Sequence, residues 1–231
     1  MPNNTKDVTY LSYNNELAVK AYSNMTHLLP TEEIIFSKYF NIPGKILDLG
    51  CGTGRTSNFL YKLGHDVTAI DYSPEMIKKA KEKNTSTNID FKVMNARHLL
   101  FADEFFDYAL FSFNGLDYLY PEEERLEALR EIYRVLKPGG IFAFSSHNSL
   151  LIPNTARRMF NFIKTVLAGR IFKYCWDYQG FGKLLTYHIS PIKQIKQLGG
   201  GFKNIEIISN YSDDFRKALF KDPYFSYVAK K

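Results

Sequence analysis

The stretch KILDLGCGTGRTSNFLYKL, residues 45–63, decides the fold class. Its first five residues, Lys45 to Leu49, form an apolar run that predicts a buried strand, and Arg55 to Leu63 predicts a helix that ends before Gly64. Between them, glycine occupies every second position, at 50, 52 and 54. Glycine tolerates positive φ and lets a ligand approach the backbone, while the start of the next helix offers free N–H groups. The stretch therefore predicts a strand, a tight ligand-binding turn and a helix.

The same alternation continues along the chain. Further strands are predicted at Asp66–Ile70, Ile89–Met94, Phe105–Phe113 and Ile141–Ser146. Further helices are predicted from Ser73-Pro74-Glu75 to about Lys83, and over Pro121–Leu136. Strands that alternate with helices predict a parallel, doubly wound α/β sheet. A helix from Ser190-Pro191 to the glycines at 199–201, and strands at Lys203–Ile208 and Phe225–Ala229, are expected to complete the sheet.

Composition limits the classes of protein that this chain can be. With 231 residues and 45% hydrophobic content, the chain can bury the core of one domain. Two cysteines, Cys51 and Cys175, are too few for a disulfide framework, and the polar start lacks the apolar run of a secretion signal. We therefore expect a cytoplasmic protein with no transmembrane segment. The net charge of +6 comes with no nucleic-acid-binding motif, and several lysines cluster at one predicted helix end, where they favour the helix dipole.

A carboxylate lies where this fold usually binds a ribose. Asp71 ends the second predicted strand about 20 residues after Gly50, the spacing at which an acid grips a ribose diol. An enzyme that binds a dinucleotide normally carries G-x-G-x-x-G, and counted from Gly50 the last position here is Arg55. This departure disfavours a nicotinamide dehydrogenase. With glycine at 50, 52 and 54, the loop instead resembles the first motif of class I S-adenosylmethionine-dependent methyltransferases.

The resemblance extends, in the order of the family's motifs, over roughly residues 44–146. Asp71-Tyr72-Ser73-Pro74-Glu75-Met76 resembles the segment whose acid binds the ribose and whose next residues flank the adenine. Asn95-Ala96 stands where many members have Asp-Ala, and the Asn95 carbonyl oxygen can accept the same hydrogen bond from the adenine amino group. Leu136-Lys137-Pro138-Gly139-Gly140 is similar to the family's loop before strand five.

This resemblance implies S-adenosylmethionine as cofactor, S-adenosylhomocysteine as product, and no metal site. Ser112 matches a further position of the family, whose backbone faces the methionine part of the cofactor. Tyrosines of the leading segment, Tyr10, Tyr13 and Tyr22, are candidates for a lid over the cofactor or for a packed helix face. The implied cofactor residues are Asp48, Gly50, Cys51, Gly52, Thr53, Asp71, Tyr72, Met76, Asn95, Ala96, Ser112 and Tyr22.

The fold that the family implies is a Rossmann-like α/β sheet of seven strands, mostly parallel, with an antiparallel last strand. One methyltransferase domain is expected over residues 1–231. Residues 1–43 are expected to form an N-terminal helical lid, with helices at Glu16–Leu29 and Thr31–Phe40. The rest divides into a cofactor-binding core at 44–147, a substrate-side insertion after strand five at 148–189, and a C-terminal completion of the sheet at 190–231.

Catalytic candidates lie past the carboxyl ends of the fourth and fifth strands, where ligands bind in such sheets. Methyl transfer mainly needs alignment and exclusion of water, but a hydroxyl nucleophile also needs a base. We predict His147 as that base, and it is equally well interpreted as a loop histidine held by hydrogen bonds. Asn114 is the second catalytic candidate. Tyr13, Tyr118 and His188 are the predicted substrate contacts.

Several functions remain open from the sequence. The first is methylation of an O, N or C atom of a small molecule. The alternatives are a methyltransferase of RNA or DNA, disfavoured because Ser112-Phe113-Asn114-Gly115-Leu116 lacks the Asn-Pro-Pro-aromatic run, and a non-catalytic protein that binds the cofactor. Basic and apolar residues mix between Arg157 and Lys173, which fits an anionic substrate, a lipid-linked one or ordinary helix packing.

Overall fold

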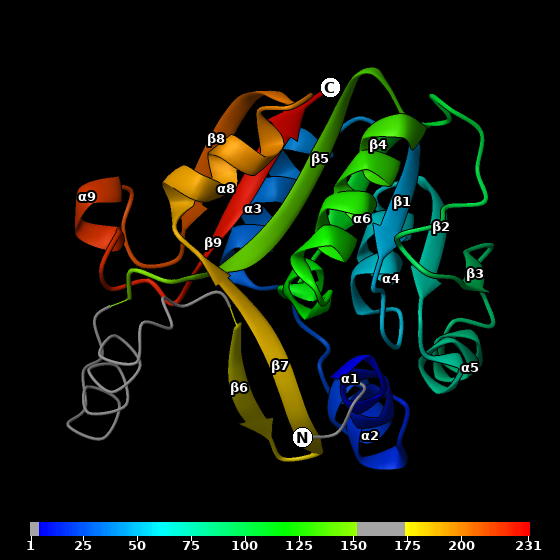
Figure 1. Ribbon diagram of the computed structural model, residues 1–231. Helices are drawn as coiled ribbons and strands as arrows, with labels where there is room; N and C mark the ends of the chain where they lie inside the picture. The colour runs from blue at the N-terminus through cyan, green and yellow to red at the C-terminus, as the bar shows by residue number, and fades with distance from the viewer. Residues whose placement is uncertain (1–4, 152–173) are drawn as a thin grey trace.

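The computed structural model describes residues 5–151 and 174–231 as an α/β fold around one central sheet (Figure 1). Strands β1 to β5 are parallel, in the order β3-β2-β1-β4-β5. Strand β9 then pairs antiparallel with β5, and β8 pairs antiparallel with β9. The bounds are β1 Lys45–Leu49, β2 Asp66–Asp71, β3 Asp90–Val93, β4 Phe106–Phe111, β5 Leu136–Asn148, β8 Lys203–Ser209 and β9 Tyr224–Lys230. The predicted mostly parallel sheet with an antiparallel last strand is confirmed.

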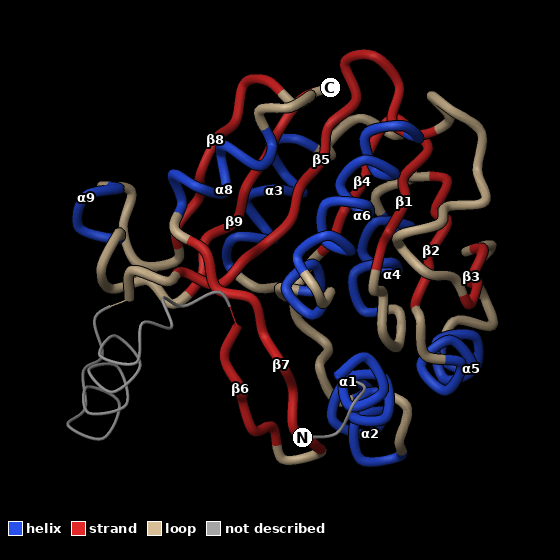
Figure 2. Tube along the Cα trace, in the orientation of Figure 1, coloured by secondary structure: helices blue, strands red, loops and turns tan. Residues whose placement is uncertain are grey.

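Helices cover both faces of this sheet, as Figure 2 shows by colour. The described helices are α1 Thr5–Tyr13, α2 Glu16–Ser23, α3 Pro30–Tyr39, α4 Arg55–Lys62, α5 Pro74–Lys83, α6 Glu122–Val135, α8 Pro191–Leu198, α9 Phe215–Ala218 and the 3₁₀ turn η1 Gly115–Tyr118. The alternation of side chains along each strand divides the core in two. Leu47 and Phe142 face the cluster that contains α6 and α8, whereas Ile46 and Ala143 face the cluster that contains α3, α4 and α5.

The N-terminal helices differ from the expectation in their ends. The helix predicted over Glu16–Leu29 ends at Ser23, and α1 was not predicted. Leu29 is extended, as residues before proline usually are, because the ring of Pro30 disfavours a helical conformation there. The next helix therefore begins at Pro30, one residue before the predicted Thr31, and its Glu32 carboxylate accepts the N–H of Leu29 at 2.7 Å.

Residues 148–189, expected to form an insertion, contain a hairpin that was not predicted. Strands β6 (Tyr174–Gln179) and β7 (Gly182–Ile189) pair antiparallel, which brings the described strands to nine rather than seven. The end of β7 runs parallel to the end of β5 through the pairs His147–His188 and Asn148–Ile189. From there the hairpin extends away from the sheet towards α1 and α2 (Figure 1).

Two expectations concern membranes. No helix within residues 5–151 and 174–231 combines the length and the apolarity that crossing a bilayer requires. The basic and apolar stretch from Arg157 to Lys173 lies outside the described residues.

Candidate cofactor and acceptor site

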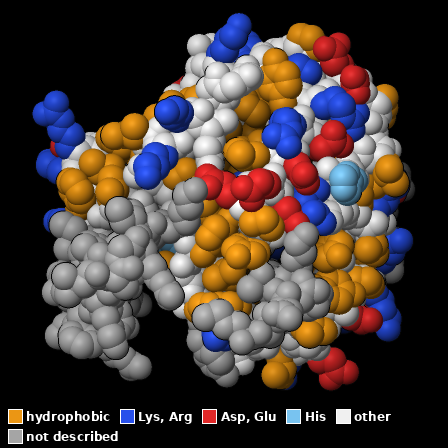
Figure 3. All heavy atoms as spheres, in the orientation of Figure 1, with side chains coloured by type: hydrophobic (Ala, Val, Ile, Leu, Met, Phe, Trp, Pro, Cys, Tyr) orange, Lys and Arg blue, Asp and Glu red, His pale blue; other side chains and the backbone are white. Residues whose placement is uncertain are grey.

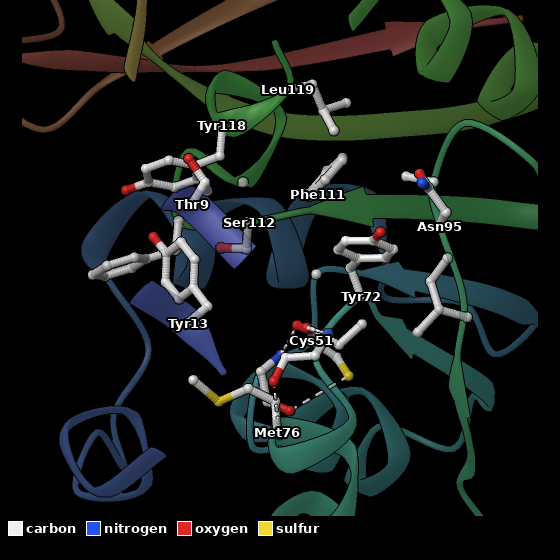
Figure 4. Close-up of a pocket in the computed structure, with 18 of the residues that line it drawn as sticks. Thr9, Tyr13, Cys51, Tyr72, Met76, Asn95, Phe111, Ser112, Tyr118 and Leu119 are labelled. Atoms are coloured by element: carbon white, nitrogen blue, oxygen red, sulfur yellow. Dashed lines mark hydrogen bonds between the residues drawn. The ribbon is translucent and has the colours of Figure 1, made fainter. Parts of the chain in front are cut away.

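One cavity of about 410 Å³ opens at the carboxyl ends of β1, β2 and β4 (Figure 4). Thirteen of the seventeen predicted site residues line it. They are Gly50, Cys51, Gly52, Thr53, Asp71, Tyr72, Met76, Asn95, Ala96, Ser112, Tyr22, Tyr13 and Tyr118. The other four, Asp48, Asn114, His147 and His188, do not line it.

The glycine loop forms one wall of this cavity because of its backbone conformation. Gly50, Gly52 and Gly54 all have positive φ, at 61°, 53° and 83°. A side chain at Gly50 would come within 2.7 Å of the Phe111 ring. A Cβ at Gly52 would meet no atom nearer than the Tyr22 ring at 3.9 Å, so it would project into the cavity itself. The loop thus leaves at Gly52 the room that a bound ligand needs against the backbone.

Asp71, at the end of β2, is fixed by this loop. Its Oδ2 accepts the N–H of Gly52 at 2.8 Å, and its Oδ1 accepts the N–H of Ser73 at 2.8 Å. Burial raises the pKa of Asp71, and the N–H donors from Ser73 and Gly52 oppose that rise. Each carboxylate oxygen has a second lone pair, so the group can still accept the two hydroxyls of a ribose.

Asn95 and its neighbours line the end of the cavity opposite α1 (Figure 4). Its Oδ1 accepts the backbone N–H of Arg97 at 3.0 Å and the Arg97 Nε at 3.3 Å. Arg97 in turn pairs with Glu124 of α6, Nη1 to Oε1, at 2.8 Å. Because the Asn95 carbonyl oxygen already has these donors, its predicted bond to the adenine amino group stays a prediction.

A buried ion pair beside the loop was not predicted. Arg55 lines the cavity and binds Glu32 with two nitrogens, Nη1 to Oε2 at 2.5 Å and Nη2 to Oε1 at 2.7 Å. The hydroxyl of Ser112 donates to the same Glu32 carboxylate, which is 3% exposed. Glu32 therefore ties α3 to the start of α4 and the end of β4. The sequence contains one signal for it, a basic residue directly after the third glycine.

Two buried groups under the loop have unused oxygen atoms. Asp48 Oδ2 accepts the hydroxyls of Thr56 and Ser57 at 2.8 and 2.6 Å, but its Oδ1 has no partner among the described residues. Burial raises the pKa of Asp48 to about 6. Thr53 Oγ1 is likewise buried and unpartnered within the described parts of the chain, and Thr53 lines the cavity. An unpartnered polar atom at such a site is explained most simply by a ligand or an ordered water.

On one side of Ser112, aromatic side chains line the cavity (Figure 4). Figure 4 shows Thr9, Tyr13 and Tyr118 on one side of Ser112, and Asn95 with Tyr72 on the other. The ring of Tyr13 lies 5.3 Å from that of Tyr118 and 5.8 Å from that of Tyr22, centroid to centroid. The rings come from α1, α2 and the segment after β4, so residues far apart in the sequence build this wall.

His147 and His188 do not line the cavity. The Nδ1 of His147 is 2.8 Å from Asp117 Oδ2, and the His147 ring stacks on His188 at 4.7 Å. Asp117 also pairs with Arg125 Nη1 at 2.6 Å, and both side chains of that pair are fully buried. The roles of His147 as base and of His188 in binding substrate therefore stay predictions.

Asn114, the other catalytic candidate, follows β4. It has φ of 57°, directly after Phe113 at 52°, and its backbone N–H donates to Ser145 Oγ at 2.7 Å. Two consecutive left-handed residues that are not glycine mark a strained segment, as is common near functional sites. Asn114 Oδ1 is buried with no partner in the described structure, and the residue does not line the cavity. Its predicted role is likewise untested.

The residues present fit S-adenosylmethionine. The space at Gly52 would let the cofactor lie against the loop backbone, and Asp71 could accept the hydroxyls of its ribose. Thr53 Oγ1 is a buried polar atom with no partner among the described residues. No group of three or more His, Cys, Asp or Glu side chains in residues 5–151 and 174–231 is placed to hold a metal ion.

Comparisons with known proteins identify the family of this chain. Residues 46–140 match the family model described as a methyltransferase domain. Over 173 residues, 69% of this chain and 70% of the relative, the sequence is 33% identical to demethylmenaquinone methyltransferase of Lactiplantibacillus plantarum. It is 38% identical to malonyl-(acyl-carrier protein) O-methyltransferase of Buchnera aphidicola over 133 residues, 55% of this chain and 51% of that protein.

The matches cover part of several curated relatives and extend to a solved structure. The chain spans about half the length of several curated relatives that it matches. A solved S-adenosylmethionine-dependent methyltransferase of Methanosarcina mazei has a TM-score of 0.67 at 22% identity, covering 88% of this chain and 98% of that one, which shows the shared fold. The chain therefore belongs to the class I S-adenosylmethionine-dependent methyltransferases, with S-adenosylmethionine as its cofactor.

Proposed function

We propose that this protein transfers a methyl group from S-adenosylmethionine to an oxygen, nitrogen or carbon atom of a small molecule. One observation carries the proposal. The cavity that the glycine loop and Asp71 line at one side continues, past Ser112, to the tyrosines Tyr13 and Tyr118 at the other. A single cavity thus provides room for a cofactor and for an acceptor next to it.

Each wall has a role in this reaction. When bound, S-adenosylmethionine supplies a methyl group activated by a sulfonium. Asp71 holds the ribose hydroxyls, and the backbone at Gly50 and Gly52 lets the cofactor lie against the loop. Tyr13 and Tyr22 exclude water from the acceptor side and restrict the orientation of the acceptor.

The names of the relatives support a small acceptor. One acts on demethylmenaquinone and another on malonyl-(acyl-carrier protein), by their names, so both a ring compound and a carrier-linked acid are methylated by proteins similar to this one. An anionic or lipid-linked acceptor remains part of the proposal, and the stretch that motivated it, Arg157 to Lys173, lies outside the described residues.

A nucleic acid acceptor is the runner-up. Proteins that bind nucleic acid usually present basic side chains together on one surface. On the face drawn in Figure 3, lysine and arginine side chains are interspersed with acidic and apolar ones. The described part of this face in Figure 3 therefore carries no basic surface of the kind that a nucleic acid would favour.

Thermal unfolding with ligands and a methyl-transfer assay test the proposal. S-adenosylmethionine and S-adenosylhomocysteine should raise the melting temperature, and NAD should not. With S-adenosylmethionine labelled in its methyl group, label should enter members of a panel of phenols, carboxylic acids and amines. Label that enters only RNA or DNA would favour the runner-up. Cofactor binding with no transfer to any acceptor would favour a non-catalytic binding protein.

A further inference from the structure

The acceptor side of the cavity offers hydroxyl groups and aromatic rings. Its lining includes Thr9, Tyr13, Tyr22 and Tyr118, together with the ring of Phe113. The Tyr22 and Phe113 rings lie 5.9 Å apart, nearly perpendicular to each other. Aromatic rings pack favourably on a further ring, edge to face or offset. The chemistry of this side therefore suits an aromatic compound.

The carboxylates that line the cavity already have partners. Among the described lining residues these are Asp71, which accepts two backbone N–H groups, and Glu124, which pairs with Arg97. None of the described lining residues is a histidine, and His147, whose Nδ1 contacts Asp117, does not line the cavity. The described lining therefore contains no histidine, and its two carboxylates are held by the glycine loop and by Arg97.

The tyrosine hydroxyls are proton donors rather than bases. Burial, with the neighbouring Tyr118 and Tyr22, raises the pKa of Tyr13 well above its usual range. Burial also raises the pKa of Tyr22, whose hydroxyl lies 3.5 Å from that of Tyr13. Phenols that keep their protons at neutral pH donate hydrogen bonds, and an anionic oxygen is the acceptor that such bonds favour most.

We propose that the acceptor is a flat aromatic compound with an acidic hydroxyl, a phenol or an enol, bound as its oxyanion to the hydroxyls of Tyr13 and Tyr118. This inference rests on the proposed function and narrows it to one class of acceptor. The hydroxyl loses its proton to solvent on binding. Its oxygen then bonds to the methyl carbon while the carbon–sulfur bond breaks with its electron pair on sulfur, which leaves an ether and a thioether and requires no further proton transfer.

The ionisation state of a bound probe tests the proposal without turnover. Para-nitrophenol absorbs visible light as its anion, and it is titrated into protein saturated with S-adenosylhomocysteine, which carries no sulfonium charge. We expect the anion-to-phenol ratio of the bound probe to exceed the ratio in solution at the same pH by about tenfold or more, the effect of hydrogen bonds to a charged group. A probe that binds in its neutral form, or that binds no better than para-nitroaniline, overturns the proposal.

Three variants locate the effect. Tyr13→Phe and Tyr118→Phe keep the rings and remove the hydroxyls, so each should reduce the ionisation of the bound probe. Tyr211→Phe removes a hydroxyl from a tyrosine that is 53% exposed and does not line the cavity, and it should behave as wild type. Equal ionisation in all three variants contradicts the proposal.

The rise in melting temperature with S-adenosylhomocysteine distinguishes a failure of the proposed function from a failure of the proposed acceptor class. A variant that keeps this stabilisation is folded and holds the cofactor product. Failure of wild-type protein to bind S-adenosylhomocysteine argues against the proposed function. Normal binding of S-adenosylhomocysteine with no effect on the probe argues only against the acceptor class.

Discussion

The ring of Phe181 lies 5.8 Å from the ring of Tyr13, centroid to centroid, although one belongs to the tip of the β6–β7 hairpin and the other to α1. Phe181 also lies 5.8 Å from Tyr22. Two hydrogen bonds fasten the hairpin to the N-terminal helices: Ser12 Oγ of α1 donates to the Lys183 carbonyl at 2.9 Å, and Asn15 Nδ2, at the N-cap of α2, donates to the Phe181 carbonyl at 3.4 Å. The position of the tyrosines on the acceptor side therefore depends on the hairpin.

Two glycines of the hairpin provide a matched test of this dependence. A Cβ at Gly182 would lie 2.5 Å from Ser12 Oγ, whereas a Cβ at Gly180 would meet nothing within 4 Å. Gly182→Ala should push the hairpin from α1, at a cost of about 1–3 kcal/mol typical of overpacking, and weaken binding of para-nitrophenol. Binding of S-adenosylhomocysteine, measured by calorimetry, should change little. Gly180→Ala should leave both affinities unchanged, and equal effects of the two substitutions would contradict the coupling.

The sequence predicted most of the sheet because its strands and helices alternate with clear stops. Lys45–Leu49 is reproduced residue for residue, and Ser73-Pro74 marks the start of α5, with the Ser73 hydroxyl accepting the N–H of Met76. The hairpin was missed although a signal existed. Gly180-Phe181 separates two runs rich in aromatic and β-branched residues, a pattern typical of a two-residue hairpin turn.

The cofactor side was predictable because its residues follow a local pattern. Glycines 50 and 52 and Asp71 belong to consecutive units of strand and turn, and the structure joins them through the bond from the Gly52 N–H to Asp71. The acceptor side depends on contacts between distant segments, such as Glu32 with Ser112, which no spacing encodes. His147 shows the same limit: the sequence predicted it just past the fifth strand, whereas it lies within β5, paired with Tyr224 and His188.

Gly52→Ala should weaken binding of the cofactor directly. The added methyl would project into the cavity, and the positive φ of 53° would strain any residue with a Cβ. We expect about a tenfold or greater loss of affinity for S-adenosylhomocysteine by calorimetry. Gly64→Ala is the control, because Gly64 also has positive φ, at 89°, but its Cβ would meet only Pro43 at ordinary contact distance. If Gly64→Ala lost as much affinity, strain rather than space at the cavity would explain the result.

Asp71→Ala should reduce cofactor affinity by about 1.5–3 kcal/mol, the range for hydrogen bonds to a charged group. The reason is the loss of both the ribose acceptor and the support of the Gly52 N–H. Asp66→Ala removes an exposed carboxylate from the opposite end of the same strand and should bind S-adenosylhomocysteine normally. Unchanged affinity in Asp71→Ala would remove this residue from the ribose site.

Asp48 should make the free protein less stable as pH rises. Burial raises its pKa to about 6, whereas an unfolded chain releases that proton near about pH 4. The folded state therefore holds the proton more tightly, and the free energy of unfolding falls between about pH 4 and 6, by about 3 kcal/mol for this one group.

Asp48→Asn should abolish that fall. Its amide oxygen can still accept the hydroxyls of Thr56 and Ser57, and its amide has no charge to release. Urea unfolding of wild type and variant across this pH range measures the difference, with Asp66→Asn as an exposed control. Parallel curves for wild type and Asp48→Asn would show that Asp48 is ionised in the folded protein throughout.

His147→Ala decides between two accounts of proton removal. A general base contributes roughly 10²–10⁴-fold to turnover, and its loss should be compensated at higher pH when the acceptor ionises unaided. In the structure, His147 contacts the buried Asp117 and does not line the cavity. With para-nitrophenol as acceptor, we therefore expect turnover within a few-fold of wild type, together with a loss of about 1–3 kcal/mol in stability as Asp117 loses a partner. A loss of turnover in the range of a base, with affinity for S-adenosylhomocysteine intact, would instead establish His147 as the base and refute an acceptor site that relies on tyrosine hydroxyls alone.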